Sequence, residues 1–250
     1  MKTAIVTGAA RGIGLATSRQ LLDQGWRVIM LDRDEPALSE AVTGLENAQP
    51  CLCDVSQPDQ VAQMAQSILP EGATLDALVN NAGVADFGPI EDTDFARWRR
   101  VMETNLDGVF LMSQACTPAL RAASGAIVNI ASISGLRAST LRVAYGTSKA
   151  GVMHLTQQQA VELGEYGVRA NCVCPGPVDT KLALAVHTPD IRAAYHDAIP
   201  LNRYGQEDEI AALVTFLCSA QASFVTGQII AADGGFEATG IGLPSLRGGA

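Results

Sequence analysis

Short apolar segments rich in β-branched residues alternate with helix-compatible stretches along most of the chain. We expect strands at residues 4–7, 27–31, 49–53, 77–80, 126–131, 169–174 and 228–231. A helix lying between two strands gives the chain the length it needs to return and pair them in parallel. The alternation therefore predicts an α/β fold, in which helices cover both faces of a parallel sheet.

The composition fits one large α/β domain, because 48% of the 250 residues are hydrophobic and only 17% are charged. With no linker or internal repeat, we predict a single domain over residues 1–250. The formal net charge of −9 repels phosphate backbones and anionic lipids, so we expect no nucleic-acid or membrane partner. No apolar run reaches the ~18 residues of a membrane span, and the start of the chain does not resemble a signal peptide. These features predict a cytoplasmic protein.

The cysteines and histidines lack the spacing of metal ligands, so we predict no metal site. The residues concerned are Cys51, Cys53, Cys116, Cys172, Cys174, Cys218, His154, His187 and His196. Buried free thiols in a reducing cytosol are the favoured interpretation, ahead of zinc ligation or a disulfide framework.

The stretch TGAARGIG at residues 7–14 directly follows the first expected strand. If a helix begins near Gly12, the free N–H groups at its positive end form a cradle for phosphate. Gly8 would allow the tight turn, Gly12 a close approach of pyrophosphate, and Gly14 close packing of the helix on the strand. A purely structural turn of the same composition remains the alternative.

Asp32 ends the second expected strand, eighteen residues after Gly14. A carboxylate at this place can accept a hydrogen bond from a ribose 2′-hydroxyl and would repel a 2′-phosphate, which favours NAD over NADP. The nearby Arg11 and Arg33 could soften that discrimination. A solvated acid in a turn is the alternative interpretation.

Tyr145 and Lys149 stand four residues apart on a stretch that predicts a helix reaching towards Leu163. An ammonium close to a phenol favours the phenolate and lowers the phenol pKa. The alternative interpretation is that Tyr145 and Lys149 are two surface residues without a shared function, which could show the same spacing by chance.

Ser132 follows the fifth expected strand, and we expect it to meet the glycine loop and Asn80-Asn81-Ala82-Gly83 at one edge of the sheet. Asn105 lies within a helical pattern, where Asn is unfavourable without a specific reason.

Taken together, these motifs resemble the short-chain dehydrogenase/reductase family, in its single-domain branch of about 250 residues. The matching segments are TGAARGIG, Asp32, Asp54-Val55, NNAG at 80–83, Asn105, Ser132, YGTSK at 145–149 and PGPVDT at 175–180. They fall in the family's order and cover the chain from Thr3 to about Gly235. The resemblance implies a Rossmann-like, doubly wound sheet of seven parallel strands in the order 3-2-1-4-5-6-7, and a homotetramer.

The resemblance also implies a role for each matching residue. Tyr145 corresponds to the general acid/base, Lys149 to the residue that lowers its pKa and binds the nicotinamide ribose, and Ser132 to the residue that orients the substrate oxygen. Asn105 corresponds to the anchor of a proton-relay water. The implied contacts to the dinucleotide are Gly8, Arg11, Ile13, Asp32, Asp54, Val55, Asn81, Gly83, Tyr145, Lys149, Pro175, Gly176, Val178 and Thr180.

The implied function is an NAD-dependent oxidoreductase that interconverts a secondary alcohol and a ketone on a cyclic alcohol, polyol or sugar. A family member that retains its cofactor during isomerisation or dehydration is one alternative, and a non-catalytic NAD sensor is the other. Residues 182–200 would form a lid, while residues 236–250 would reach a neighbouring subunit or fray.

The residues that line the substrate pocket are harder to predict. Val84, Ser134, Leu136 and Ala138 are candidates. The expected lid adds Ala183, Leu184, Ala185 and Val186, which suit a carbocycle or aliphatic ketone, and His187, Tyr195 and His196, which could bond a polyol or sugar. Arg137 and Arg142 lie between Ser132 and Tyr145, near the expected rim. Either arginine could pair with a substrate carboxylate, although a surface or subunit-interface role is the favoured interpretation for both.

Overall fold

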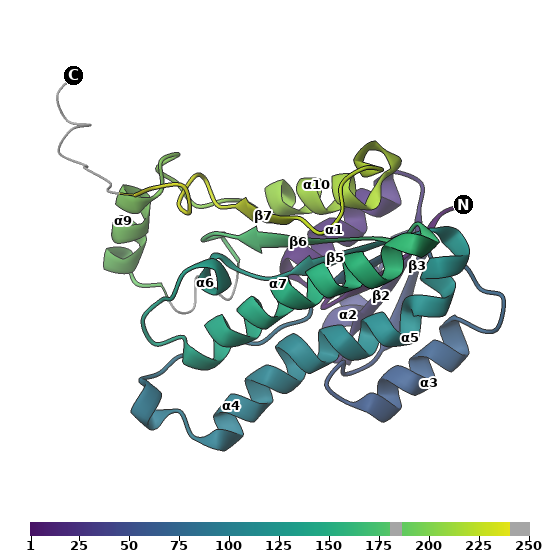
Figure 1. Ribbon diagram of the computed structural model, residues 1–250, viewed down its shortest axis with the longest axis horizontal. Helices are drawn as coiled ribbons and strands as arrows, with labels where there is room; N and C mark the ends of the chain where they lie inside the picture. The colour runs from purple at the N-terminus through teal and green to yellow at the C-terminus, as the bar shows by residue number, and fades with distance from the viewer. Residues whose placement is uncertain (181–186, 241–250) are drawn as a thin grey trace.

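Seven parallel strands form one sheet in the order β3-β2-β1-β4-β5-β6-β7 in the computed structural model, which describes residues 1–180 and 187–240 (Figure 1). The strands are β1 (Thr3–Thr7), β2 (Arg27–Asp32), β3 (Ala48–Leu52), β4 (Ala77–Asn80), β5 (Ala126–Ile130), β6 (Arg169–Pro175) and β7 (Ile229–Ala232). The order reverses between β1 and β4, which pair directly through Ala4 and Ala77. The predicted fold class and strand order are confirmed.

Helices connect the strands and cover both faces of the sheet. The longer ones are α1 (Gly12–Asp23), α2 (Glu35–Val42), α3 (Pro58–Ile68), α4 (Phe95–Met102), α5 (Gly108–Ala123), α7 (Val143–Leu163), α9 (Pro189–Ala198) and α10 (Glu207–Cys218). Shorter turns are α6 (Ile133–Leu136), the 3₁₀ turns η1 (Ile90–Asp92), η3 (Gly164–Tyr166) and η4 (Ala220–Ala222), and the π-helical η2 (Glu103–Asp107). Within the described residues, no helix combines the length and apolarity needed to cross a membrane.

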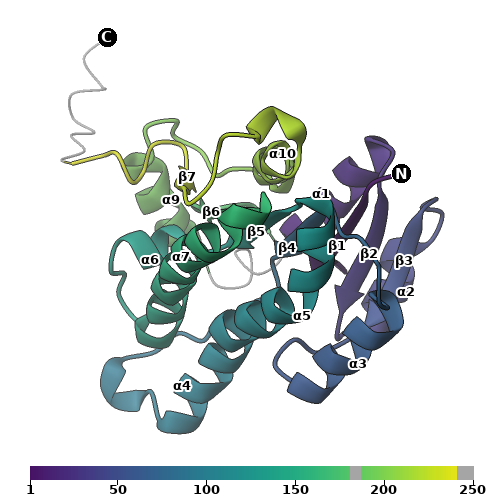
Figure 2. The same ribbon diagram turned by 45° about the vertical axis from the view of Figure 1, so that its right-hand side comes forward.

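The core has two layers because successive strand residues point to opposite faces. Val6 of β1 packs with side chains from α1, α2 and α10, whereas its neighbour Ile5 packs with side chains from α3, α5 and α7. In Figure 2, α10 accordingly lies on one side of the strands and α5 and α7 on the other. Both faces are covered, which explains why the inner strands are apolar at nearly every position instead of alternating.

A buried polar network crosses the second layer beneath the carboxyl edge of the sheet. Asn80 of β4 donates from Nδ2 to Asn129 Oδ1 on β5 at 2.8 Å and to Ser113 Oγ on α5 at 3.1 Å. Asn129 in turn donates to Thr156 Oγ1 at 2.9 Å and to Gln159 Oε1 at 2.8 Å, both on α7. These bonds hold α5 and α7 at a defined place on the sheet, because each buried polar group is costly without its partner.

Most strands begin or end one residue away from the expected position. Strand β5 ends at Ile130, one residue before the expected end, because Ser132 caps the short helix α6 and the chain leaves the sheet to reach it. All six cysteines are free, and five of them are buried while Cys51 is partly exposed. Within the described residues, no cluster of His, Cys, Asp or Glu is arranged to hold a metal ion.

Replacing Asn129 tests the buried network. The Asn129→Ala variant leaves Asn80, Thr156 and Gln159 without their shared partner, so its free energy of unfolding should fall by about 2–4 kcal/mol. Urea unfolding measures the change. Gln63→Ala, which removes an exposed amide from α3, is the matched control and should stay within about 0.5 kcal/mol of the parent. An Asn129→Ala protein as stable as the control would show that the network adds no stability.

Candidate active site

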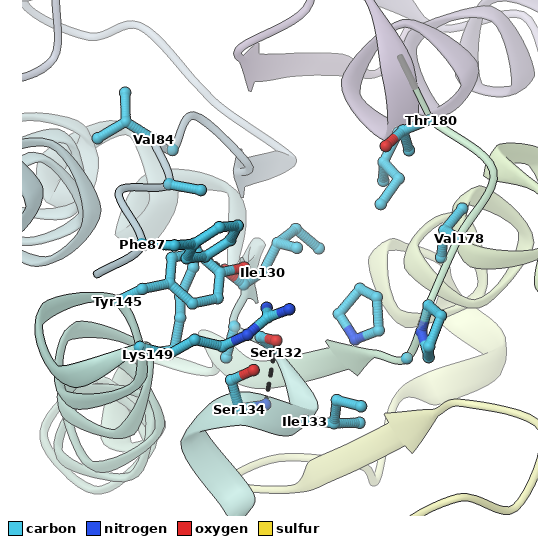
Figure 3. Close-up of a pocket in the computed structure, with 18 of the residues that line it drawn as sticks. Val84, Phe87, Ile130, Ser132, Ile133, Ser134, Tyr145, Lys149, Val178 and Thr180 are labelled. Atoms are coloured by element: carbon cyan, nitrogen blue, oxygen red, sulfur yellow. Dashed lines mark hydrogen bonds between the residues drawn. The ribbon is translucent and has the colours of Figure 1, made fainter. Parts of the chain in front are cut away.

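A cavity of about 220 Å³ opens at the carboxyl edge of the sheet, between the ends of β4, β5 and β6 and the first turns of α7. The described residues that line it are Ile13, Asn81, Gly83, Val84, Ala85, Phe87, Ile130, Ala131, Ser132, Ile133, Ser134, Arg142, Tyr145, Lys149, Pro175, Gly176, Pro177, Val178, Thr180, His187 and Tyr195. In Figure 3, Phe87, Tyr145 and Lys149 lie on one side of this space, and Val178 and Thr180 lie on the other.

The glycine loop between β1 and α1 depends on three glycines for different reasons. Gly8 and Gly12 both have φ of +64°, a conformation that side-chain-bearing residues rarely adopt. A Cβ on Gly14 would lie 2.2 Å from the Gly8 carbonyl oxygen and 2.6 Å from Asn81 Nδ2, so this position has no room for one. Arg11 is the N-cap of α1 and supplies no side-chain acceptor, which leaves the helix N-terminus with backbone N–H groups to offer.

Thr7 and Asn81 join the glycine loop to the loop that follows β4. Thr7 Oγ1 accepts hydrogen bonds from the backbone N–H groups of Asn81 and Ala82, each at 3.0 Å. Asn81 Nδ2 donates to the carbonyl oxygens of Thr7 at 3.0 Å and Gly8 at 3.1 Å. The two loops therefore form one unit at the point where the strand order reverses, which is the place where open α/β sheets bind ligands.

Asp32 lies at the end of β2, beside this unit. Its Oδ2 accepts from the N–H of Ala10 at 3.1 Å, and its Oδ1 accepts from the N–H of Asp34 at 3.1 Å. These bonds fix the carboxylate against the glycine loop. The carboxylate is only partly buried, so it keeps acceptor capacity towards the outside of the loop.

The two arginines near Asp32 are each paired with another acid. Arg11 forms an exposed ion pair with Asp34, and Arg33 forms one with Asp54 at 3.3 Å. Although burial opposes it, hydrogen bonds from Ser56 and Arg33 hold the pKa of Asp54 below its usual value. Both guanidinium charges are thus already compensated by carboxylates.

Ser132 is placed by the end of β5 and the start of α6. It is the N-cap of α6, and its Oγ accepts from the backbone N–H of Ser134 at 3.1 Å (Figure 3). The side chain is 8% exposed and lines the cavity, as Tyr145 does. Capping fixes the place of the hydroxyl at the start of α6.

Tyr145 and Lys149 both lie on α7 and face the cavity, as their spacing predicts. Lys149 is 4% exposed, and its Nζ donates to the carbonyl oxygen of Ile130 at 2.8 Å. The ammonium lies 5.9 Å from the centre of the Tyr145 ring. This buried hydrogen bond fastens the first turns of α7 to the end of β5.

Burial governs the protonation of both side chains. Burial raises the pKa of the Tyr145 phenol above its usual value, against the smaller opposing effects of the nearby Ser132 hydroxyl and the Arg142 charge. Burial also lowers the pKa of Lys149 to about 8. Desolvation of the phenol thus outweighs the opposing effects of its neighbours in this structure.

Asn105 lies in the π-helical turn η2 and is completely buried. Its Oδ1 accepts from the N–H of Val84 at 2.8 Å, while its Nδ2 donates to Val84 O at 2.9 Å and to Ser148 Oγ at 3.1 Å. These contacts supply the specific reason for an Asn within a helical pattern. Its side chain joins the loop after β4 to α7, immediately behind the cavity wall.

Comparison with known proteins agrees with this geometry. Residues 8–237 match a family model described as enoyl-(acyl carrier protein) reductase. The chain is 40% identical to cis-4-hydroxycyclohexanecarboxylate dehydrogenase of Sinomonas cyclohexanicum, over 95% of this chain and 97% of that protein. It is also 40% identical to galactitol 2-dehydrogenase (L-tagatose-forming) of Cereibacter sphaeroides, over 93% and 94% of the two chains. A short-chain type dehydrogenase/reductase from Mycobacterium ulcerans superposes with a TM-score of 0.91 at 30% identity, over 98% and 93%.

The chain belongs to the short-chain dehydrogenase/reductase family. The predicted family is thus confirmed, and with it the class of activity, which is oxidoreductase chemistry with a nicotinamide cofactor.

In this short-chain dehydrogenase/reductase, the cavity brings together most of the residues predicted for the site. Those that line it are Ile13, Asn81, Gly83, Ser132, Tyr145, Lys149, Pro175, Gly176, Val178 and Thr180. Those that do not are Gly8, Arg11, Asp32, Asp54, Val55 and Asn105. Val55 in particular is 5% exposed and packs against Gly108, where a Cβ would lie 2.8 Å from its Cγ2. Its side chain belongs to the core.

Among the pocket candidates, Val84, Ser134, His187 and Tyr195 line the cavity, whereas Leu136, Ala138 and His196 do not. The candidates at 183–186 lie outside the described residues. Phe87 lines it without having been predicted. An aromatic residue shortly after the NNAG loop is the only sequence signal for Phe87, and it does not distinguish a pocket wall from core. Of the lid predicted at 182–200, residues 182–186 lie outside the described residues, as do residues 241–250 of the predicted tail.

Proposed function

We propose that this chain is an NAD-dependent dehydrogenase that interconverts a secondary alcohol and a ketone on a small substrate, with Tyr145 as the general acid/base. The observation that carries the proposal is the convergence of Ser132, Tyr145 and Lys149 on one cavity. That cavity is also bordered by Pro175, Gly176, Val178 and Thr180 after β6, the segment proposed to hold the nicotinamide.

The loops at the strand-order reversal fit a dinucleotide. Among the described residues, the one atom within 4 Å of the position that a Cβ on Gly12 would take is Glu207 Oε1, at 3.7 Å, so the backbone is open next to the N-terminus of α1. A pyrophosphate suits such a place, since it is anionic and accepts from backbone N–H groups. The residues proposed to hold the dinucleotide are Gly8, Arg11, Ile13, Asp32, Asp54, Val55, Asn81, Gly83, Tyr145, Lys149, Pro175, Gly176, Val178 and Thr180. Val55 would take part through its backbone.

A nicotinamide held there would supply the acceptor for hydride from the carbinol carbon and, in the reverse direction, the hydride donor to the ketone. The Ser132 hydroxyl orients the substrate oxygen by hydrogen bonding. The Tyr145 phenolic oxygen takes the hydroxyl proton during oxidation and donates it during reduction. Lys149 is proposed to bind the nicotinamide ribose and to stabilise the phenolate through its charge. Asn105 is proposed to anchor a proton-relay water behind Lys149.

The charges around Asp32 support NAD over NADP. A 2′-phosphate would meet the Asp32 carboxylate directly. The arginines that could attract it, Arg11 and Arg33, are already paired with Asp34 and Asp54. A ribose 2′-hydroxyl needs only an acceptor, which Asp32 supplies.

Cyclic alcohols, polyols and sugars are the proposed substrates, in line with the names of the relatives at 40% identity.

We also propose that the protein is a cytoplasmic homotetramer. Unpaired cysteines suit a reducing compartment. Exposed apolar side chains on α5 and α7, Phe110 at 48% and Val161 at 79% exposure, suit subunit contacts.

The first test is turnover. Purified protein incubated with NAD and a panel of cyclohexanols, alditols and hydroxycyclohexanecarboxylates should produce NADH, followed at 340 nm. The Tyr145→Phe variant should bind NAD normally but lose at least about 10²-fold in kcat, because its ring keeps the shape and lacks the proton acceptor. Tyr166→Phe, which changes a distant partly exposed tyrosine, is the matched control. Equal turnover by Tyr145→Phe and this control would exclude Tyr145 as the acid/base.

Asp32 should determine the choice of cofactor. Asp32→Ser removes the charge that repels a 2′-phosphate, so kcat/KM for NADP should rise about tenfold or more while that for NAD falls. Steady-state kinetics with both dinucleotides measure the ratio, and Asp23→Ser at the distant end of α1 serves as the control. An unchanged ratio would place the discrimination elsewhere.

The rate of alcohol oxidation should increase with pH. Because burial raises the pKa of Tyr145, only a small fraction is phenolate near neutrality, and that fraction grows about tenfold per pH unit below the pKa. The kcat/KM for oxidation should therefore climb from pH 6 to pH 8, with enzyme returned to pH 7 as the control for inactivation. A flat profile over this range would mean that the catalytic base has a pKa below 6.

A further inference from the structure

The charge of the cavity is opposite to that of the protein. The chain carries 26 Asp and Glu residues against 17 Lys and Arg. Among the described residues that line the cavity, however, there is no Asp or Glu, while Lys149 and Arg142 are both present. Burial and the nearby arginine charges lower the pKa of His187, so this lining histidine is neutral near pH 7. A cavity lined in this way favours an anionic ligand.

Arg142 is the residue immediately before α7 and is held in place on several sides. Its carbonyl oxygen accepts from the N–H of Gly146 at 2.7 Å, and its backbone pairs with that of Gly88. The guanidinium carbon lies 4.4 Å from the centre of the Phe87 ring, and Phe87 in turn contacts the edge of Tyr145 at 5.9 Å between ring centres. The guanidinium is therefore fixed beside the proposed acid/base, one helical turn away along the chain.

Neighbouring arginines are neutralised, whereas Arg142 is not. Arg137, five residues earlier, pairs with Glu237 at 2.8 Å, and Arg192 pairs with Asp179 at 2.7 Å. Arg97 pairs with Asp86. Within residues 1–180 and 187–240, no carboxylate forms an ion pair with Arg142. The guanidinium keeps its donors and its charge for a ligand in the cavity.

We propose that Arg142 binds a carboxylate on the substrate, so that the preferred substrates are hydroxy acids whose carboxylate is remote from the carbinol. This inference rests on the proposed function, since Tyr145 and Ser132 mark where the carbinol lies. A guanidinium matches a carboxylate with two parallel N–H donors, which fixes orientation as well as adding affinity. The single guanidinium charge that no carboxylate compensates favours a monoanion over a dianionic phosphate.

Binding of a non-reactive ligand tests the inference without turnover. Calorimetry should show that cyclohexanecarboxylate binds the NADH-saturated protein about tenfold or more tightly than neutral cyclohexanecarboxamide of nearly the same shape. The preference should disappear in Arg142→Gln, persist in part in Arg142→Lys, and remain intact in Arg137→Gln, which removes an equal charge from the same segment. Added NaCl should weaken the preference in the unmodified protein, a result that needs no variant to fold.

Three results would overturn the role of Arg142: equal affinity for the two ligands, binding of neither, or a preference that survives in Arg142→Gln. The kinetic counterpart compares 4-hydroxycyclohexanecarboxylate with its carboxamide: Arg142→Gln should raise KM for the acid relative to KM for the carboxamide, while Arg137→Gln should leave that ratio unchanged. NAD reduction with neutral alcohols but no anion preference would remove the inference and keep the proposed function. Anion binding without NAD turnover would keep Arg142 as an anion-binding residue and remove the proposed function, and with it the conclusion about substrates.

Discussion

Parallel pairing of all seven strands is the constraint on which the site depends. Because the strands point the same way, their carboxyl ends meet at one edge, and loops far apart in sequence come together there. The hydrogen bond from Lys149 Nζ to Ile130 O then connects that edge to α7. Together with the network around Asn129, this contact fixes the place of Tyr145 on α7 relative to Ser132 at the start of α6. Thr7 and Asn81 perform the same task between β1 and β4.

The buried side chains of the site explain both its rigidity and its protonation. Asn105, Lys149 and the network around Asn129 make hydrogen bonds inside the protein that hold α7 against the sheet. The same burial raises the pKa of Tyr145 and lowers that of Lys149. A phenol in this position is a ready proton donor, and it becomes a proton acceptor to the extent that positive charge nearby stabilises the phenolate.

The sequence was informative wherever one local rule decided the outcome. Alternating apolar segments predicted the strands to within a residue or two, and the spacing of Tyr145 and Lys149 predicted a shared helix face. The sequence was uninformative where contacts between residues far apart in the chain determine the partners or the burial of a side chain. Arg137 and Arg142 read alike in the sequence, and only the fold brings Glu237 to the first and leaves the second in the cavity. The pKa of Tyr145 could not be predicted either, because it depends on how deeply the folded chain buries the phenol.

Carboxylates that pair with arginines can explain which ligands the site accepts at two places. One is the proposed ribose-binding end near Asp32, and the other is the proposed substrate end near Arg142. Asp34 and Asp54 compensate Arg11 and Arg33 next to Asp32, so this end retains an acceptor and no spare cation. Asp86 and Glu237 pair with Arg97 and Arg137 away from the cavity, so the acids of this acidic chain do not reach Arg142. Among the described residues that line the cavity, Arg142 thus keeps a charge that no carboxylate compensates, beside Lys149. The placement of acids, more than that of arginines, then determines which anions the protein admits.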